Sequence, residues 1–428
     1  MAGNICYNHA MQLGNRVYVD FLGCKLNQAE VEQISLDLTG KGFVLSKNIG
    51  QSDYYILNSC AVTSEAESKS RAKLARAKRQ NPQIIRVLIG CCGQKDREKY
   101  FQNGLVEYVF GNLDKYDFFA VLPPSPPSHL GLPQAFLGRK RSFVQIQEGC
   151  DNFCSFCIVP LLRGKPVSFP LSQIVATVKN RFKLGYLEVT LTGTEIGAYR
   201  EGEGDLVSLI QAILTHTEIP RLRLSSLQPT EITDSLLRLF KDSPRLCPHF
   251  HIPLQSASNV ILKKMNRMYT IEQYSAALNR IWQWLPQAAV TTDIIVGFPT
   301  ETNEEFQKTL DFCRSTSFSR LHVFAYNKRP GTKASLLDGQ INDKYKKERM
   351  AEFLELAVQK QSNFAQKHLG ATVSVYVEGS RNGLYEGYAP DYLRVCFPAR
   401  RDVSGQIINV RVDSLASQGQ FVWGSENF

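Results

Sequence analysis

Three cysteines lie within the segment GCDNFCSFC, and their spacing is the strongest chemical signal in the chain. Cys150, Cys154 and Cys157 are separated by three and two residues, so their thiols lie on one short loop and can converge on one metal centre. A cubane iron–sulfur cluster has four irons, and three thiolates leave one iron without a protein ligand. The spacing therefore predicts a cluster with an open iron that is available for chemistry.

An iron without a protein ligand can bind a small molecule that carries both an amino group and a carboxylate. S-adenosylmethionine chelates such an iron in radical enzymes, so we expect it as the cofactor. Phe156, directly before the third cysteine, is a candidate to pack over the adenine of the cofactor, or else a core residue. The main alternative is structural zinc, which takes four ligands and would need Cys247 or His249 as the fourth.

A second set of cysteines lies in three turns of the N-terminal part: Cys24 in GCKLNQAE, Cys60 in NSCAVTSE and Cys91 in IGCCGQ. Each follows a predicted strand. If these strands are parallel, the turns lie at one edge of the sheet, where the thiols can meet. The residues alone leave open a second three-cysteine cluster or three unconnected turn cysteines. Cys92 competes with Cys91, but the order of Gly90 and Cys91 matches the GC of the first turn.

The elements that must hold these thiols follow from the alternation of apolar and polar residues. Strand and helix patterns alternate from Arg16 to Phe119, which predicts a small parallel α/β domain. Six further strand–helix repeats between Arg141 and about Gly370 predict a partial (β/α) barrel, in which chemistry takes place at the carboxyl ends of the strands. Short strands and Gly-containing turns from about Ala371 predict a small antiparallel β-barrel. The expected fold class is therefore α/β with a terminal β-barrel.

The domain limits follow from the same patterns. We expect an N-terminal domain at 14–120, a linker at 121–138, a barrel domain at 139–368 and the small terminal barrel at 369–428. The linker is predicted from the Pro-, Ser- and Gly-rich stretch VLPPSPPSHLGLP.

Charge and hydropathy limit the partners and the compartment. The net charge of +10 is compatible with a polyanionic partner, because clustered Lys and Arg release counterions from phosphates. No run approaches the roughly 18 apolar residues of a membrane span, and the start of the chain lacks the apolar stretch of a secretory signal. We therefore expect a cytoplasmic protein without a membrane partner, and its eleven cysteines to be core residues or metal ligands rather than disulfides.

Motifs in both halves resemble the radical S-adenosylmethionine methylthiotransferases over almost the whole length. The matching pieces are GCKLN, NSCAVT and GCCGQ, then GCDNFCSFCIVPLLRGK, LTGTEIGAY, HIPLQSASNVILKKMNRMYT and TDIIVGFPTET. GCKLNQAE and SEAESKSR resemble the branch that acts on threonylcarbamoyladenosine in tRNA, more than the branches that act on isopentenyladenosine or on a ribosomal-protein aspartate. The third turn departs from the family, which usually has GCYAQ or similar where this chain has GCCGQ.

The resemblance implies an N-terminal methylthiotransferase domain, a central radical domain and a C-terminal TRAM domain that binds RNA. It also implies two [4Fe-4S] clusters, one that generates the deoxyadenosyl radical and one auxiliary cluster. The radical would remove hydrogen from C2 of adenosine 37, and the carbon radical would capture a methylthio group from the auxiliary cluster. The implied ligands of the radical-generating cluster are Cys150, Cys154 and Cys157. Those of the auxiliary cluster are Cys24, Cys60 and Cys91.

Further candidates for cofactor contact follow the predicted barrel strands. LTGTE resembles the family's motif for the amino group of S-adenosylmethionine, so Gly193 and Glu195 are expected there, with a surface glutamate as the alternative. The remaining candidates would surround ribose and adenine, or else form plain turns: Gln255, Ser256, Asp293 and Gly297.

A run of basic residues follows the second auxiliary cysteine on a predicted helix. They are candidates to grip the phosphates of a tRNA anticodon stem-loop, and a merely solvated helix is the alternative. The residues are Lys69, Arg71, Lys73, Arg76, Lys78 and Arg79. The reaction also requires an electron donor and a sulfur donor, which the sequence does not identify. A competing hypothesis of another class is a metal-stabilised RNA-binding protein without catalysis.

Overall fold

The computed structural model describes residues 14–123, 140–417 and 419–426. The chain divides into two compact units, Met1–Leu132 and Pro133–Phe428, and each is described here by itself. Most of the predicted linker at 121–138 lies outside the described residues. The limits 14–120, 139–368 and 369–428 stay predictions.

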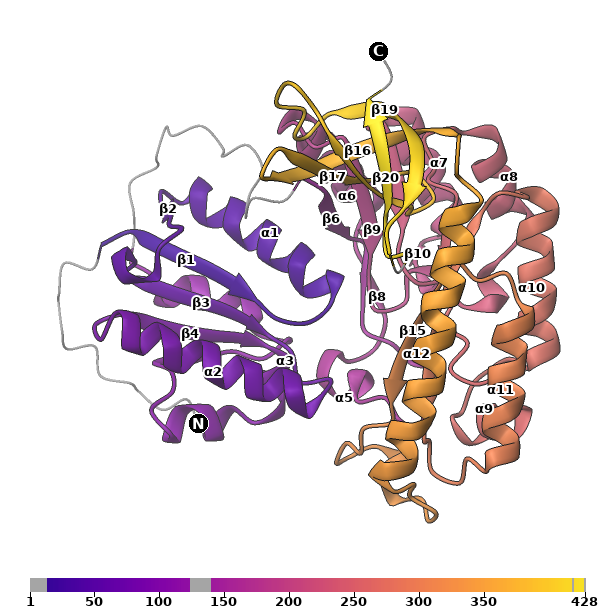
Figure 1. The fold of residues 1–428 in the computed structure, drawn as a ribbon. Coiled ribbons are helices and arrows are strands. Elements are labelled where there is room, and N and C mark those ends of the chain that lie inside the picture. Colours follow the sequence, from indigo (N-terminus) through magenta and orange to yellow (C-terminus); the bar gives the residue numbers. More distant parts are fainter. Residues whose placement is uncertain (1–13, 124–139, 418, 427–428) are drawn as a thin grey trace. The chain divides into compact units, whose positions relative to one another are not determined.

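The first unit is a parallel sheet with the strand order β2-β1-β3-β4-β5, which confirms the predicted α/β fold (Figure 1). The helix expected after the third predicted strand is divided at Asp96, whose side chain caps the second piece by accepting from the Lys99 backbone N–H. The strands are β1 (Arg16–Phe21), β2 (Val44–Leu45), β3 (Tyr54–Ser59), β4 (Ile85–Gly90) and β5 (Tyr108–Val109). The helices are α1 (Lys25–Gly40), α2 (Ser64–Gln80), α3 (Cys91–Lys95) and α4 (Arg97–Gln102).

Residues at both ends of the basic helix α2 stabilise it. Thr63 accepts a hydrogen bond from the Ala66 N–H at the N-terminus, where the free donors of a helix need partners. Glu65 lies in the first turn and Arg79 in the last, so both charges complement the helix dipole.

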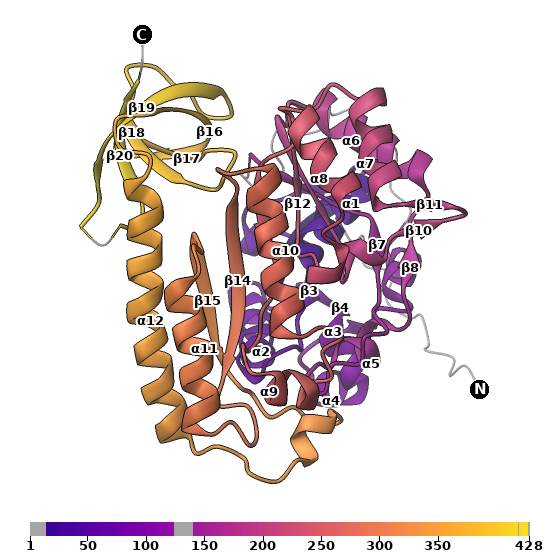
Figure 2. The same ribbon diagram turned by 90° about the vertical axis from the view of Figure 1, so that its right-hand side faces the viewer.

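The second unit begins with six parallel strands in two sheets, β12-β9-β6 and β13-β14-β15 (Figures 1 and 2). Parallel bridges Leu222–Leu246 and Ser226–His251 join the sheets, giving the predicted partial barrel. Its strands are β6 (Ser142–Gln145), β9 (Glu188–Thr192), β12 (Arg221–Leu224), β13 (His249–His251), β14 (Ala289–Val296) and β15 (Arg320–Ala325). Its helices are α5 (Val159–Arg163), α6 (Leu171–Lys183), α7 (Leu206–His216), α8 (Asp234–Asp242), α9 (Asn259–Lys264), α10 (Ile271–Trp284), α11 (Asn303–Ser315) and α12 (Asp343–Gln366).

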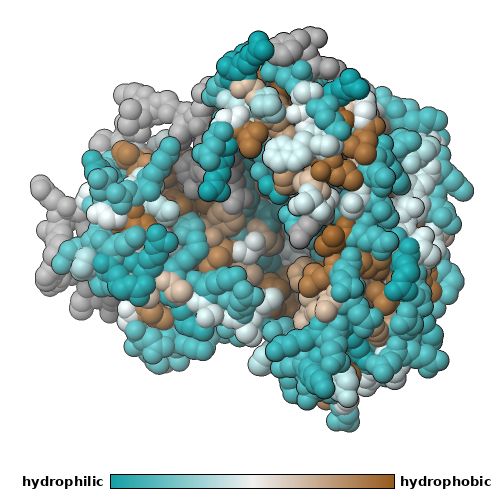
Figure 3. Space-filling model, viewed as in Figure 1, coloured by the Kyte–Doolittle hydropathy of each residue, from teal (hydrophilic) through white to brown (hydrophobic). Residues whose placement is uncertain are grey.

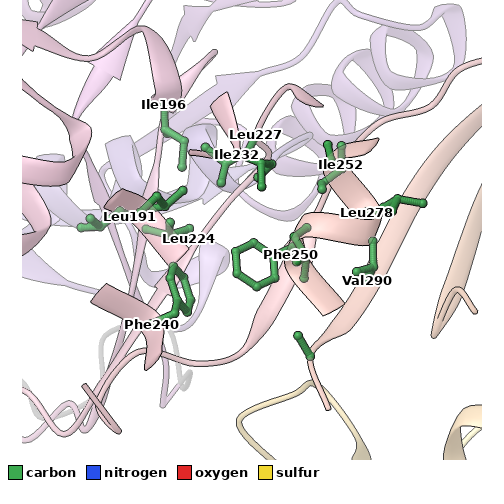
Figure 4. Packing of buried hydrophobic residues seen from close by; sticks show 14 of the residues in the cluster. Leu191, Ile196, Leu224, Leu227, Ile232, Phe240, Phe250, Ile252, Leu278 and Val290 are labelled. Carbon is green, nitrogen blue, oxygen red and sulfur yellow. The ribbon is translucent and has the colours of Figure 1, made fainter. Parts of the chain in front are cut away.

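Alternate residues of the barrel strands form a large apolar core with the helices. Leu191, Leu224 and Val290 belong to it, and the rings of Phe240 and Phe250 lie 4.7 Å apart near its centre (Figure 4). Because successive side chains of a strand point to opposite faces, the positions between these core residues face the inside of the barrel.

A closed five-stranded barrel ends the chain, as expected, in the order β16-β17-β18-β20-β19. One pairing, β18 with β20, is parallel, because an odd number of strands cannot close with every neighbour antiparallel. The strands are β16 (Thr372–Arg381), β17 (Leu384–Tyr388), β18 (Arg394–Pro398), β19 (Ile407–Leu415) and β20 (Val422–Glu426). In the described part of the chain, no helix combines the length and apolar character needed to cross a membrane.

Buried arginines join this barrel to the base of the partial barrel. Arg223 donates to the Pro390 carbonyl oxygen at 2.7 Å, and its guanidinium lies 4.1 Å from the centre of the Tyr392 ring. The same guanidinium pairs with Glu188 on the neighbouring strand at 3.0 Å. Both residues of this ion pair are fully buried.

Candidate cluster and cofactor site

The three predicted auxiliary cysteines lie where strands of the first unit's parallel sheet end. Cys24 precedes α1, Cys60 directly follows β3, and Cys91 begins α3 after β4. The pKa of Cys60 is raised to about 12, mainly by burial, and the neighbouring thiols of Cys91, Cys24 and Cys92 contribute to the increase because thiolates repel one another. The structure therefore brings the three predicted thiols into one neighbourhood.

Glycines directly before two of these cysteines allow the close approach. Gly23 has φ +108°, and a Cβ there would lie 2.6 Å from the Cβ of Cys60. Gly90 has φ +88°, and a Cβ there would lie 2.4 Å from Oδ1 of Asn58. Each Gly-Cys pair thus has its glycine in a left-handed turn that packs closely against the end of β3.

Two asparagines that the sequence interpretation missed hold the same thiols. Asn27 Oδ1 accepts from the Cys24 thiol at 3.3 Å, while its Nδ2 donates to the Ser59 carbonyl oxygen at 2.9 Å. Asn112 Nδ2 lies 3.4 Å from the sulfur of Cys91. The spacing of Asn27 in GCKLN was an available signal for the first contact, whereas nothing near Cys91 in sequence points to Asn112.

Cys92 lies close to the predicted ligand set, but its own polar groups are engaged by the fold. Its backbone N–H donates to Ser59 Oγ at 3.1 Å, and its thiol donates to the Cys60 carbonyl oxygen at 3.2 Å. Burial raises the pKa of this thiol, and the Tyr100 hydroxyl is also a hydrogen-bond partner. Cys92 is thus fully buried and engaged by the fold, while Cys24 is exposed.

The second cysteine loop lies in the partial barrel, after β6 and the short strand β7 (Gln147–Glu148). Burial raises the pKa of Cys150 to about 12 and of Cys157 to about 11. The loop folds back on itself, because the Cys157 N–H donates to the Cys154 carbonyl oxygen at 3.0 Å. Without metal the thiols of Cys150 and Cys157 stay protonated near neutral pH, and ligation must displace their protons.

The segment that follows α9 supports the cysteine loop from the side. Asn266, with φ +57°, donates from Nδ2 to the carbonyl oxygens of Asn152 and Phe153, both at 3.1 Å. Its neighbour Arg267 donates from Nη1 to the Cys154 sulfur at 3.2 Å. Sequence interpretation gave neither residue a role, although both belong to the motif MNRMYT.

Glu195 lies beside the first cysteine of the loop. Its carboxylate accepts from the Cys150 thiol at 3.3 Å and from Asn152 Nδ2 at 2.5 Å. The pKa of nearby Glu231 is raised to about 7, mainly by burial and in part by the negative charge of Glu195. Glu195, the predicted contact for the amino group of S-adenosylmethionine, therefore lies next to Cys150, a predicted iron ligand. The carboxyl group of Glu231 lies close to Glu195.

Two buried polar atoms at the strand ends have no hydrogen-bond partner among the described residues. They are Oε1 of Gln255, whose side chain is buried at φ +63°, and Oγ1 of Thr194, which directly precedes Glu195. A buried polar atom without a hydrogen-bond partner destabilises the fold unless a ligand supplies the missing hydrogen bond. A polar cofactor such as S-adenosylmethionine fits these donors and acceptors.

The other predicted cofactor residues are placed less uniformly. Gly193 lies against the carbonyl oxygen of Gln147, and Phe156 packs on an apolar cluster near the cysteine loop. Asp293 Oδ2 lies 3.2 Å from His251 Nε2. Ser256 and Gly297 form hydrogen bonds within the fold itself. Ser256 Oγ lies 3.2 Å from Thr309 Oγ1, and the Gly297 N–H donates to the Glu301 carboxylate at 2.7 Å.

The six basic residues lie on α2, on a largely hydrophilic surface (Figure 3). Three carry acidic partners: Lys69 with Glu65 and Lys73 with Asp20, both at 2.6 Å, and Lys78 with Glu107 at 4.0 Å. The more exposed members of the set are Lys69, Arg76, Lys78 and Arg79, whereas Arg71 and Lys73 are half-buried.

The geometry of the thiols also bears on the zinc alternative. Within the described ranges, no group of three or more His, Cys, Asp or Glu side chains converges as a single metal ion requires. A zinc ion needs its donors about 2.0–2.3 Å from one point. A cubane binds each thiolate through a different iron, so its ligands are spread more widely.

Comparisons with known proteins match both units. Residues 144–313 match the model of the Radical SAM superfamily, and residues 16–111 match that of the Uncharacterized protein family UPF0004. Threonylcarbamoyladenosine tRNA methylthiotransferase MtaB of Bacillus subtilis (strain 168) is 33% identical, over 94% of this chain and 95% of its own. The protein of the same name from Chlamydia pneumoniae is 34% identical over 93% and 95%. The tRNA-2-methylthio-N(6)-dimethylallyladenosine synthase of Endomicrobium trichonymphae is 31% identical over 92% and 96%.

Solved structures agree on the fold. The radical S-adenosylmethionine methyltransferase TsrM of Kitasatospora setae has a TM-score of 0.56 at 12% identity, covering 96% of this chain and 85% of its own. At such low sequence identity, the similarity to this structure shows the fold alone. The relatives, by contrast, exceed 30% identity over nearly the whole chain. The chain therefore belongs to the radical S-adenosylmethionine tRNA methylthiotransferase family.

Proposed function

We propose that the protein inserts a methylthio group at C2 of N6-threonylcarbamoyladenosine at position 37 of tRNA. The relatives named as acting on threonylcarbamoyladenosine are 33–34% identical to this chain, and those named for dimethylallyladenosine 31–32%. The slightly higher identity to the first group agrees with the motifs GCKLNQAE and SEAESKSR, which resemble the branch that acts on threonylcarbamoyladenosine. Dimethylallyladenosine is the second candidate substrate.

One observation carries the proposal of sulfur transfer: the chain has two separate thiol groups where radical formation needs only one. The loop with Cys150, Cys154 and Cys157 is sufficient for a radical-generating cluster. The gathering of Cys24, Cys60 and Cys91 at strand ends of another sheet has no use in radical formation, so we assign these thiols to an auxiliary [4Fe-4S] cluster.

The chain's own residues have distinct tasks in this proposal. Glu195 and Gln255 orient S-adenosylmethionine at the strand ends, and Arg267 holds the Cys154 sulfur. When bound, the two clusters and the cofactor supply the deoxyadenosyl radical and the methylthio group. The residues on α2 bind phosphates of the anticodon stem-loop, where positive charge gains from counterion release. Electrons and sulfur come from partners yet to be identified, in the cytoplasm.

Mass spectrometry of nucleosides tests the proposal directly. The purified protein, loaded with iron and sulfide without oxygen, is incubated with S-adenosylmethionine, a sulfide source, a chemical reductant and a stem-loop carrying threonylcarbamoyladenosine. We expect a product heavier by one methylthio group in place of hydrogen. A product formed only from dimethylallyladenosine would move the protein to the other branch, and no product from either would reject the proposal.

A further inference from the structure

The loop that follows β5 in the first unit brings one side chain against the sulfur of Cys91. Asn112 is 6% exposed, and its Nδ2 lies 3.4 Å from Sγ of Cys91. Twenty-one residues separate the two in the chain, so the contact depends on how this loop is held. Because we assign Cys91 to the auxiliary cluster, the Asn112 amide is a direct neighbour of a cluster ligand.

Hydrogen bonds to the backbone hold this loop in place. Gln94 Oε1 accepts from the N–H groups of Asn112 at 3.0 Å and of Leu113 at 3.4 Å. Asp114 Oδ1 accepts from the Gly111 N–H at 2.7 Å. The backbone on both sides of Asn112 is thus fixed by contacts that do not involve its own side chain.

The other asparagine at these thiols faces its sulfur with the opposite polarity. Asn27 Oδ1 accepts from the Cys24 thiol, whereas its Nδ2 donates to two backbone carbonyl oxygens, both at 2.9 Å. These two bonds hold the amide in this orientation, so ligation of Cys24, which displaces the thiol proton, leaves an acceptor beside the sulfur. Asn112 instead presents an N–H to Cys91, and a thiolate accepts such a bond. Of these two contacts, the one at Cys91 suits a ligand thiolate.

We infer that Asn112 is a positioning residue of the auxiliary cluster, whose amide donates a hydrogen bond to the Cys91 sulfur and raises the reduction potential of the cluster. This inference rests on the proposed function. A hydrogen bond to a ligand sulfur is stronger when the sulfur carries more negative charge, so it stabilises the reduced cluster more than the oxidised one. Reduction of the cluster is therefore easier with this amide than without it.

Sulfur insertion releases an electron, which gives this reduction potential a role in the reaction. As the methylthio sulfur leaves the auxiliary cluster and bonds to carbon, the carbon radical contributes one electron to the new bond and the sulfur contributes two. One electron is left over, and the auxiliary cluster takes it. An amide that stabilises the reduced cluster therefore assists the formation of the carbon–sulfur bond, and not the formation of the deoxyadenosyl radical.

Two substitutions separate the hydrogen bond from side-chain packing. Asn112→Leu removes the donor and keeps a similar bulk, whereas Asn112→Asp keeps the shape and replaces the donor by a negatively charged oxygen. Both are made in the Cys154→Ala protein, which lacks a ligand of the radical-generating cluster, and Asn103→Leu, at the exposed residue directly after α4, is the matched control. Each protein is loaded with iron and sulfide without oxygen. Redox titration followed by electron paramagnetic resonance measures the potential, and iron content and thermal unfolding are measured in parallel.

We expect Asn112→Leu to shift the reduction equilibrium by about tenfold toward the oxidised cluster, which is about 59 mV for one electron. Asn112→Asp should lower the potential further, while Asn103→Leu leaves it unchanged and all the proteins keep their iron. An unchanged or higher potential in both Asn112 variants would overturn the inference, as would loss of iron from both, because the contact would then be structural. A Cys154→Ala parent that binds no iron would instead reject the auxiliary cluster of the proposed function.

Discussion

The guanidinium of Arg267 contacts the sulfur of Cys154, with Nη1 and Sγ 3.2 Å apart. A positive charge here stabilises a thiolate ligand and, with it, the additional negative charge of a reduced cluster. Asn266, the preceding residue, fixes the backbone of the same loop. This relationship leads to a prediction about electron transfer rather than about folding.

Replacing Arg267 by Gln should make reduction of the radical cluster harder. Loss of the positive charge should lower the reduction potential by about 60 mV, since about 1.4 kcal/mol corresponds to 59 mV for one electron. Redox titration followed by electron paramagnetic resonance measures the shift, with Arg411→Gln on the exposed face of β19 as the control. An unchanged potential in Arg267→Gln, with full iron content, would mean that this contact does not tune the cluster.

Substitution of Gly23 should damage the first thiol group selectively. In Gly23→Ala the new Cβ would collide with Cys60 at 2.6 Å, and the φ of +108° adds backbone strain of about 1–3 kcal/mol. We expect loss of about half of the bound iron and retention of S-adenosylmethionine cleavage. Gly40→Ala is the control, since a Cβ at Gly40 meets no atom within 4 Å. Full iron content in Gly23→Ala would contradict the assigned site.

Removing Arg223 should loosen the attachment of the terminal barrel. Arg223→Met leaves the buried carboxylate of Glu188 without its main partner and frees the Pro390 carbonyl oxygen. Breaking a buried pair in this way costs about 3–5 kcal/mol. Chemical denaturation measures the loss, and the exposed Arg411→Met should change stability by less than about 0.5 kcal/mol. Equal effects of both substitutions would show that the buried pair adds no stability.

The contact between His368 and Asp391 should make the stability of the second unit depend on pH. Burial alone would lower the pKa of His368, but the hydrogen bond and charge of Asp391, at 2.6 Å, outweigh it and raise the pKa. The stabilisation is therefore complete below pH about 6.5 and is lost as the pH rises through the raised value. His368→Gln should be less stable than wild type at pH 6, with a smaller difference at pH 9. Thermal unfolding at both pH values measures this, and a difference that grows with pH would contradict the prediction.

Sequence alone predicted β1, β3 and β4 of the first sheet and the six strands of the partial barrel, because each has a distinct apolar pattern, but it missed β2 and β5, which have only two residues each. It singled out the cysteines because Gly-Cys turns and the GCDNFCSFC spacing are local signals. It could not find Arg267 or Asn112, whose partners Cys154 and Cys91 are 113 and 21 residues away in the chain. It also gave no sign that Ser256 turns to Thr309, because either face of that turn is compatible with a serine. Contacts made across the fold, rather than along the chain, account for what was missed.

The most direct test of two thiol groups with separate tasks compares Cys60→Ala with Cys154→Ala. Both loaded proteins are incubated with S-adenosylmethionine, a reductant and the threonylcarbamoyladenosine stem-loop, and 5′-deoxyadenosine and methylthiolated nucleoside are quantified together. Cys60→Ala should form 5′-deoxyadenosine without methylthiolated product, and Cys154→Ala should form neither. Full product from Cys60→Ala would contradict the division of tasks between the two groups.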